Sequence, residues 1–584
     1  MDITKKLVSV ASGREKAELV IKGGTLINVY TGEVLPRTDV AIAAGRVAYV
    51  GPDASHTTGP RTKVINAEGL HISPGFIDAH THLDIYCTPT EFARVFITHG
   101  TTTIFSECIE LASVLGYAGV KLFMREAKSL PLKVYTLIPM CSAQDLALSS
   151  SHSLTLEEVG EGLKDNRVKG LGEVVSWPRV LSLDEDYFSK MALAKRAGKR
   201  IEGHSPGARG WKLVAYSASG ITSCHESING DDTMERLRLG MWAMIRYGGV
   251  RKDLKTAIRP LLDDKLKARR AVLVSDSTDP REALKFGHMD EVVRQAIREG
   301  LDPTTSIQMV TLNPAEHFGM EAEIGGVAPG RSADILLIDD TERVGIRGVI
   351  IDGRLVARDG KLLIPLRSFP YPRYALNSVR LRPLRPEAFR VHAEGVSVRV
   401  RVMELVNEHI SREVVQEMPV VDGQVVPDAD ILKVAVIDRH WNTGRMALGF
   451  LKGFGSRVGA VASTLNFDEN NLVVLGARDD DMALAVNELI RSQGGIIVVD
   501  GGRVLAHLPL PYAGVCSLRP IRETAKILDK IISILKASGS PFENPLIAIL
   551  FLTFVTLPAL KISDRGLVDV RNRKFVPLIV EDNT

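Results

Sequence analysis

Short apolar strands alternate with helical patterns through the middle of the chain, between residues 73 and 324. Such alternation is typical of parallel strands joined by helices. The stretch is about 250 residues long, which is the usual size of a (β/α)8 barrel. After a first strand that ends in a pair of histidines, the pattern predicts strands at 100–105, 134–138, 170–174, 200–203, 221–223 and 271–274.

Segments rich in short strands flank this middle part on both sides. Residues 19–72 alternate apolar and polar residues in short runs separated by glycine turns, and a similar pattern returns after Gly325. This pattern is typical of antiparallel strands joined by tight turns. We therefore expect a catalytic barrel (73–324) inserted into one β-sandwich domain, which is split between residues 1–72 and 325–380.

A cluster rich in proline and arginine at 381–386 predicts a linker to a third domain, residues 387–584. Strand patterns at 396–402, 472–475 and 495–499 mix there with helical patterns at 481–492 and 521–537. This mixture fits an α/β or α+β domain. The expected fold class of the whole chain is α/β.

Composition narrows the class of protein. A chain of 584 residues is too long for a single core, and 45% hydrophobic with 24% charged residues is typical of a soluble globular protein. A net charge of +3 gives no reason to expect a nucleic acid or a membrane as partner. Five cysteines without a CxxC pair, and a start without the apolar core of a signal peptide, favour the cytoplasm. We expect a homo-oligomer, a dimer being the commonest kind.

The strand that opens the expected barrel ends in His80-Thr81-His82. Side chains alternate along a strand, so both imidazoles project from the same face and can reach one metal ion. Two unrelated surface histidines would give the same pattern. Residues at the ends of later strands favour the metal.

Polar side chains follow four further strands of the expected barrel, where such enzymes place their active sites. These residues are Glu173, His204, His225 and Asp276. Each one alone is more often a structural histidine, a helix cap or a loop carboxylate. Together with His80 and His82 they would satisfy one or two divalent ions such as Zn, Fe(II) or Mn(II).

The chain resembles the adenine deaminases of the amidohydrolase superfamily over nearly its whole length. The motifs that carry the resemblance are Pro74-Gly75-Phe76-Ile77-Asp78-Ala79-His80-Thr81-His82, Gly170-Leu171-Gly172-Glu173-Val174, Gly203-His204-Ser205-Pro206-Gly207, Ser223-Cys224-His225-Glu226, Ala328-Pro329-Gly330-Arg331, Asp438-Arg439-His440 and Leu508-Pro509-Leu510-Pro511. This resemblance implies a binuclear divalent metal centre (Mn, Fe or Zn) and a purine-like substrate.

By the same resemblance, His80, His82 and Asp276 are expected to hold one metal, and His204 and His225 the other. Glu173 is expected to bridge the two ions, with Glu107 and Glu110 as alternatives for that place. Metal-bound hydroxide would attack the carbon that bears the amino group, turning adenine or a related aminopurine into the oxo-purine (hypoxanthine from adenine) and ammonia. His225 and Asp276 would take part in catalysis, Asp276 as the proton acceptor, and Glu173, Glu110 or Glu107 would protonate the ring nitrogen.

Several polar positions depart from the family pattern. The usual Asp-Pro-His-Glu is Glu107-Cys108-Ile109-Glu110, and the usual His-Asp-Ser-His-Asn of the third domain is Phe467-Asp468-Glu469-Asn470-Asn471. A pocket that recognises a base by hydrogen bonds depends on such groups. The alternatives are therefore an amidohydrolase acting on another heterocycle or cyclic amide C–N bond, and a non-enzymatic relative that keeps the fold.

Overall fold

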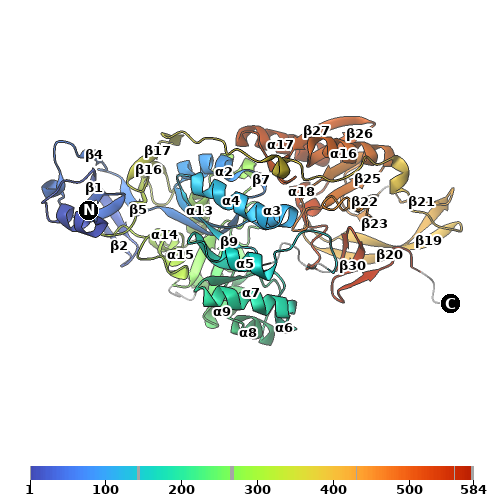
Figure 1. Cartoon of the computed structure of the whole chain (residues 1–584), viewed down its shortest axis with the longest axis horizontal. Helices are drawn as coiled ribbons and strands as arrows, with labels where there is room; N and C mark the ends of the chain where they lie inside the picture. The colour runs from blue at the N-terminus through green and yellow to red at the C-terminus, as the bar shows by residue number, and fades with distance from the viewer. Residues whose placement is uncertain are drawn as a thin grey trace.

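Parallel strands form the centre of the molecule in the computed structural model, which describes residues 2–140, 145, 147–263, 269–428, 430–557 and 559–580 (Figure 1). One sheet has the order β11-β10-β9-β8-β6 and a second the order β12-β13-β14. Strand β12 packs beside β11, and β14 packs beside β6, so the parallel strands curl around a common interior. Their bounds are β6 Phe76–His82, β8 Thr101–Glu107, β9 Lys133–Ile138, β10 Val168–Val174, β11 Arg200–Gly203, β12 Ser223–Cys224, β13 Trp242–Arg246 and β14 Ala271–Val274.

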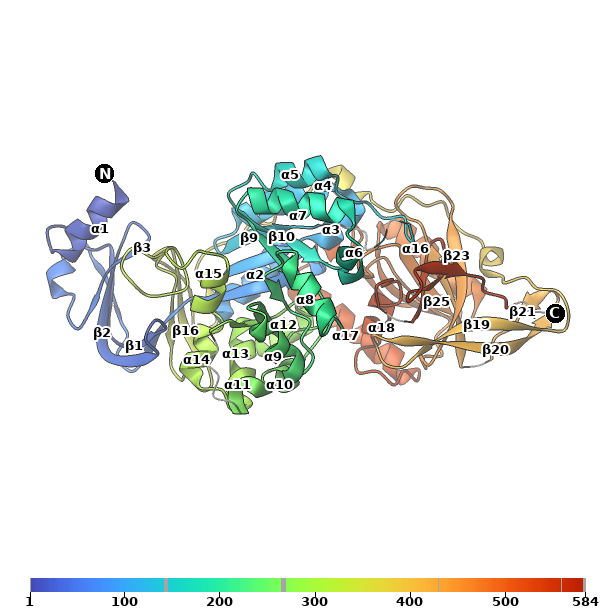
Figure 2. The same ribbon diagram turned by 90° about the horizontal axis from the view of Figure 1, so that it is seen from below.

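Apolar side chains from several of these strands form one buried cluster, among them Ile77, Phe105, Leu137, Met244 and Val272. Strand β13 has no counterpart among the sequence predictions, because a short run buried on both sides has no period that separates it from a buried helix. Helices cover the outside of the sheet (Figure 2). The longer ones are α2 Pro89–Phe96, α4 Tyr117–Ser129, α7 Glu185–Arg196, α8 Trp211–Ala218, α9 Gly230–Arg238 and α13 Met289–Arg298.

A nine-stranded sheet lies at the N-terminal end of the molecule and is built from two distant segments, 19–74 and 335–362 (Figure 1). The segments meet where β15 pairs antiparallel with β5, with Ile335 opposite Pro74. Its strands are β1 Leu19–Asn28, β2 Glu33–Ala43, β3 Arg46–Gly51, β4 Lys63–Asn66, β5 His71–Pro74, β15 Ile335–Ile338, β16 Ile346–Ile351, β17 Arg354–Arg358 and β18 Lys361–Leu362.

The C-terminal part packs against the opposite end of the curled sheet (Figure 2). Its nine-stranded sheet has the order β21-β20-β19-β23-β22-β25-β24-β26-β27. The strands are β19 Ser397–Leu405, β20 Ser411–Val421, β21 Gln424–Val425, β22 Ile431–Ile437, β23 Met446–Lys452, β24 Ala460–Ser463, β25 Leu472–Gly476, β26 Gly495–Asp500 and β27 Arg503–Pro509, with helices α16 Asp479–Ser492, α17 Ile521–Ala537 and α18 Pro545–Leu550. A smaller sheet follows, made of β29 Leu560–Ser563, β30 Gly566–Asp569 and β31 Lys574–Val576.

The mixed α/β class expected from the sequence is confirmed by these sheets and helices. Within the described residues, no helix combines the length and apolar character needed to cross a membrane.

Candidate metal centre

The predicted site residues lie at the carboxyl ends of the central parallel strands. His80 and His82 belong to the end of β6, and Glu173 to the end of β10. His204 and His225 directly follow β11 and β12, and Asp276 follows β14. Parallel strands place their carboxyl ends at one edge of a sheet, so residues far apart in sequence meet there.

Glu173 lies between two pairs of histidines. Its Oε1 is 3.2 Å from His82 Nε2 and 3.5 Å from His80 Nε2. Its Oε2 is 2.6 Å from His204 Nδ1 and 3.4 Å from His225 Nε2. Burial opposes ionisation of this carboxyl, but His225 and His204 hold its pKa well below the usual range. One carboxylate therefore faces both imidazole pairs, each with a different oxygen.

Asp276 completes the His80 side of the cluster. Its Oδ1 is 3.2 Å from His80 Nε2 and 3.8 Å from His82 Nε2. Its backbone N–H donates to the carbonyl of His80 at 3.0 Å, which ties the end of β14 to β6. Burial would raise the pKa of Asp276, but its hydrogen bond with His80 and the charge of Arg246 hold that pKa well below the usual range. Asp276 is therefore an anion at neutral pH.

Two buried residues that the sequence did not single out also belong to the site, namely Glu226 and Arg246. Glu226 Oε1 lies 3.5 Å from both His204 Nδ1 and His225 Nε2. Arg246 forms an ion pair with Glu226 and donates from Nη1 to Asp276 Oδ2 at 3.2 Å. Against the effect of burial, Arg246 lowers the pKa of Glu226 to about 2. Glu226 could have been found from the sequence, because it directly follows the predicted residue His225. Arg246 could not, because it is the last residue of β13, a strand that the sequence did not predict.

The two remaining candidate glutamates occupy different places, and neither lies between the imidazole pairs. Glu107 Oε1 accepts a hydrogen bond from the backbone N–H of Glu173 at 2.6 Å. Glu110, on helix α3 (Ile109–Leu115), accepts one from the side-chain amide of Asn470. Burial raises the pKa of both carboxyls well above the usual range, with further contributions from Glu173 for Glu107 and from Asp468 for Glu110. Glu173 has the geometry of a bridge, and these two do not.

The donor set fits a divalent metal. Three groups of residues could each hold a metal ion, because within each group one ligand atom per residue lies within 4.8 Å of the others. The groups are His80 with Glu173, His225 and Asp276; His204 with His225 and Glu226; and His82 with Glu107 and Glu173. Among the described residues, Glu107 Oε2 is a buried oxygen without a hydrogen-bond partner. Imidazole nitrogens with carboxylate oxygens are the ligands that Zn, Fe(II) and Mn(II) prefer.

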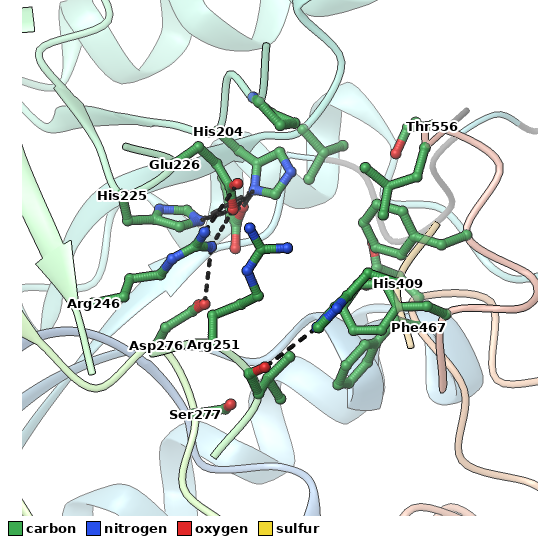
Figure 3. A pocket seen from close by; sticks show the side chains of 18 of the residues that line it. His204, His225, Glu226, Arg246, Arg251, Asp276, Ser277, His409, Phe467 and Thr556 are labelled. Atoms are coloured by element: carbon green, nitrogen blue, oxygen red, sulfur yellow. Dashed lines mark hydrogen bonds and ion pairs between the residues drawn. The ribbon is translucent and has the colours of Figure 1, made fainter. Parts of the chain in front are cut away.

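A cavity of about 330 Å³ opens on this cluster and extends to the C-terminal part of the chain (Figure 3). His204, His225, Glu226 and Asp276 line one side, together with Glu110. The other side comes from the C-terminal part, namely His409, Phe467, Asp468, Phe551 and Phe554. His440 is not among the lining residues, because its ring is buried and Nε2 contacts the backbone oxygen of Glu469 at 2.9 Å.

A parallel α/β sheet with a His, Asp and Glu cluster at its carboxyl edge defines a metal-dependent hydrolase of the amidohydrolase type. The amidohydrolase family model matches residues 71–356, and the model of the adenine deaminase C-terminal domain matches residues 408–574. Adenine deaminases from Moorella thermoacetica, Clostridium botulinum and Cenarchaeum symbiosum are 44%, 40% and 38% identical to this chain, with 99%, 100% and 99% of it aligned. The alignments cover 98%, 98% and 95% of those proteins. The chain belongs to the adenine deaminase family.

Proposed function

We propose that the chain is a hydrolase that converts adenine to hypoxanthine and ammonia. The observation that carries this proposal is the geometry of Glu173, whose two oxygens face separate imidazole pairs at the floor of a mostly apolar pocket. The names of the full-length relatives support adenine as the substrate.

His80, His82 and Asp276 would hold one divalent ion, His204 and His225 a second, and Glu173 would contact both. Mn(II), Fe(II) and Zn(II) all suit these ligands. When bound, such ions activate a water molecule as a nucleophile at neutral pH. Glu226 Oε1 lies 3.5 Å from both imidazoles of the second pair, and its carboxylate is ion-paired with Arg246. In this proposal Arg246 offsets the charge of Glu226, and Glu226 orients the two imidazoles.

Asp276 is the group that moves the proton of the attacking water. Its carboxylate is ionised at neutral pH, and Oδ2 is fixed by Arg246 Nη1 at 3.2 Å while Oδ1 faces His80. A carboxylate in this position can accept the proton of the water and return it to the departing amine. Loss of ammonia requires that second transfer.

Glu110 is the best candidate for the acid that protonates the ring nitrogen. It lines the pocket and is 1% exposed, and burial raises the pKa of its carboxyl well above the usual range, which favours the protonated form. A neutral carboxyl can donate to the nitrogen beside the attacked carbon and offset the negative charge that develops on the ring. Glu107 and Glu173 are less suited to this role, because both lie among the candidate ligand atoms.

The C-terminal part supplies the wall on which a flat base would rest. Phe467, Phe551 and Phe554 line the pocket opposite the metal centre, and Phe551 packs against the other two rings with centroids 5.3 and 5.4 Å away. Aromatic rings favour stacked contacts with a purine. The cavity volume also suits a small ligand.

The same proposal covers the domain organisation. The curled parallel strands are taken as a (β/α)8 barrel (73–324), and the sheet that joins 19–74 to 335–362 as a split β-sandwich (1–72 and 325–380). The segment 387–584 is taken as a third domain. Pairing of β15 with β5 supports the split, since it joins the two segments on either side of the barrel.

The test is ammonia release by manganese-loaded protein from a panel of aminopurines, pterins and cyclic amides. We expect adenine to be the best substrate, and Asp276→Asn to be inactive on it while remaining folded, as judged by a cooperative thermal unfolding transition. If adenine were inert and a cyclic amide were opened, the alternative amidohydrolase function would replace this one. Asn at position 276 keeps the size of the side chain and removes its charge, so persisting activity would refute the metal mechanism.

A further inference from the structure

Glu107 is a buried carboxyl whose two oxygens have different surroundings. It ends β8, where it pairs with His82 across the parallel register, and it is 0% exposed. Oε1 accepts the backbone N–H of Glu173 at 2.6 Å. Oε2 is buried and has no hydrogen-bond partner in the described part of the chain.

A buried carboxylate oxygen without a donor is costly unless a cation compensates it. Among the described residues, no arginine or lysine forms an ion pair with Glu107. Its ligand atom instead lies within 4.8 Å of those of His82 and Glu173. The side chains of His82, Glu107 and Glu173 thus bring three possible metal ligands together.

Glu110 provides an internal comparison. It too is a buried glutamate, three residues further on in helix α3, but its carboxyl accepts a hydrogen bond from the side chain of Asn470 and belongs to none of the groups of candidate ligands. Burial by itself therefore does not leave a glutamate oxygen unpaired in this region. Glu107 differs because its Oε2 has no hydrogen-bond partner among the described residues and its ligand atom lies within 4.8 Å of that of His82.

We propose that Glu107 is a further metal ligand, binding through Oε2 the ion that His80 and His82 hold. This inference rests on the metal centre of the proposed function. Oε1 keeps its hydrogen bond to the Glu173 backbone, so one side chain both fixes the bridging residue and binds the ion. Together with Glu173 and Asp276, Glu107 gives that ion three carboxylate ligands. Such a set of oxygen ligands favours Mn(II) or Fe(II) over Zn(II), which prefers softer ligands.

The experiment compares metal-free wild type with Glu107→Gln and Glu107→Asp in titrations with Mn(II), Zn(II) and Co(II). Gln keeps an oxygen for the Glu173 N–H and loses the charge, whereas Asp keeps the charge and loses reach. We expect both to bind Mn(II) at least about 10-fold more weakly, with a smaller loss for Zn(II). The visible spectrum of the Co(II) form should change, because the ligand set changes.

Glu110→Gln is the matched control and should leave the Mn(II) affinity and the Co(II) spectrum at their wild-type values. A wild-type Co(II) spectrum in Glu107→Gln would overturn the proposal, even with weaker binding, because the residue would then only position Glu173. Should Glu107→Gln fail to fold, Glu107→Asp decides the question by the same readouts. Wild-type protein that binds none of these metals would instead refute the proposed function.

Discussion

Replacing Glu110 by glutamine should remove the proton that the ring nitrogen receives while leaving the metal centre intact. The side chain is 1% exposed and accepts a hydrogen bond from Asn470. Burial, together with the nearby carboxyls of Asp468 and Asp84, raises the pKa of Glu110 well above its usual range. This shift favours the protonated form of the Glu110 carboxyl, relative to an exposed glutamate.

The size of the effect follows from what a positioned acid contributes. General acid catalysis typically supplies about 10²- to 10⁴-fold in rate, or about 3–5 kcal/mol of transition-state stabilisation. Glutamine has the same shape and can still accept from Asn470, but it cannot release a proton. We expect kcat for adenine to fall by about that factor, with little change in KM.

The pH dependence of kcat provides a second measure. As a general acid, Glu110 acts in its protonated form, so kcat should fall as pH rises through the raised pKa of this carboxyl. This alkaline decrease in kcat should be absent in Glu110→Gln. Metal content is measured in parallel, so that loss of the ions is not mistaken for loss of the acid.

A suitable control is Glu126→Gln. Glu126 is also buried with a raised pKa, but it binds Thr90 and Tyr371 and does not line the pocket. We expect its kcat to match the wild type. Wild-type kcat in Glu110→Gln, or an unchanged alkaline decrease in kcat, would refute the assignment of Glu110 as the acid.

Three further predictions concern other parts of the site. His82→Asn should lose both bound metal, by elemental analysis, and ammonia release; full metal content with normal turnover would contradict the ligand assignment. Arg246→Met leaves the buried carboxylates of Glu226 and Asp276 without their cation, so it should destabilise the fold by about 3–5 kcal/mol, seen as a lower melting temperature, with Arg246→Lys intermediate. Burial lowers the pKa of Lys561 from 10.5 to about 7; the unfolded chain therefore binds more protons between these values, and stability should rise with pH there by up to about 5 kcal/mol. Lys561→Met should lack this rise in stability. The prediction would be contradicted if the melting temperatures of the two proteins changed with pH in the same way between pH 7 and 10.

Much of the fold was predictable because its signals are local. The helix expected at 521–537 is α17 with the same bounds, and the strand expected at 200–203 is β11. These segments carry a clear apolar period or a run closed by turn residues. Strand β13 was not predictable in this way, since its five residues are all buried and have no alternating pattern.

The sequence by itself determined that histidine and carboxylate side chains meet at one place: residues placed directly after successive strands come together whenever those strands are parallel neighbours. Tertiary structure decided how the site is divided among them. Glu173 rather than Glu107 faces both imidazole pairs, and Glu110 is held by Asn470, a residue 360 positions away in the sequence. The aromatic wall of the pocket likewise comes from the C-terminal part. Contacts of this range depend on how domains pack, and no local period in the sequence encodes that packing.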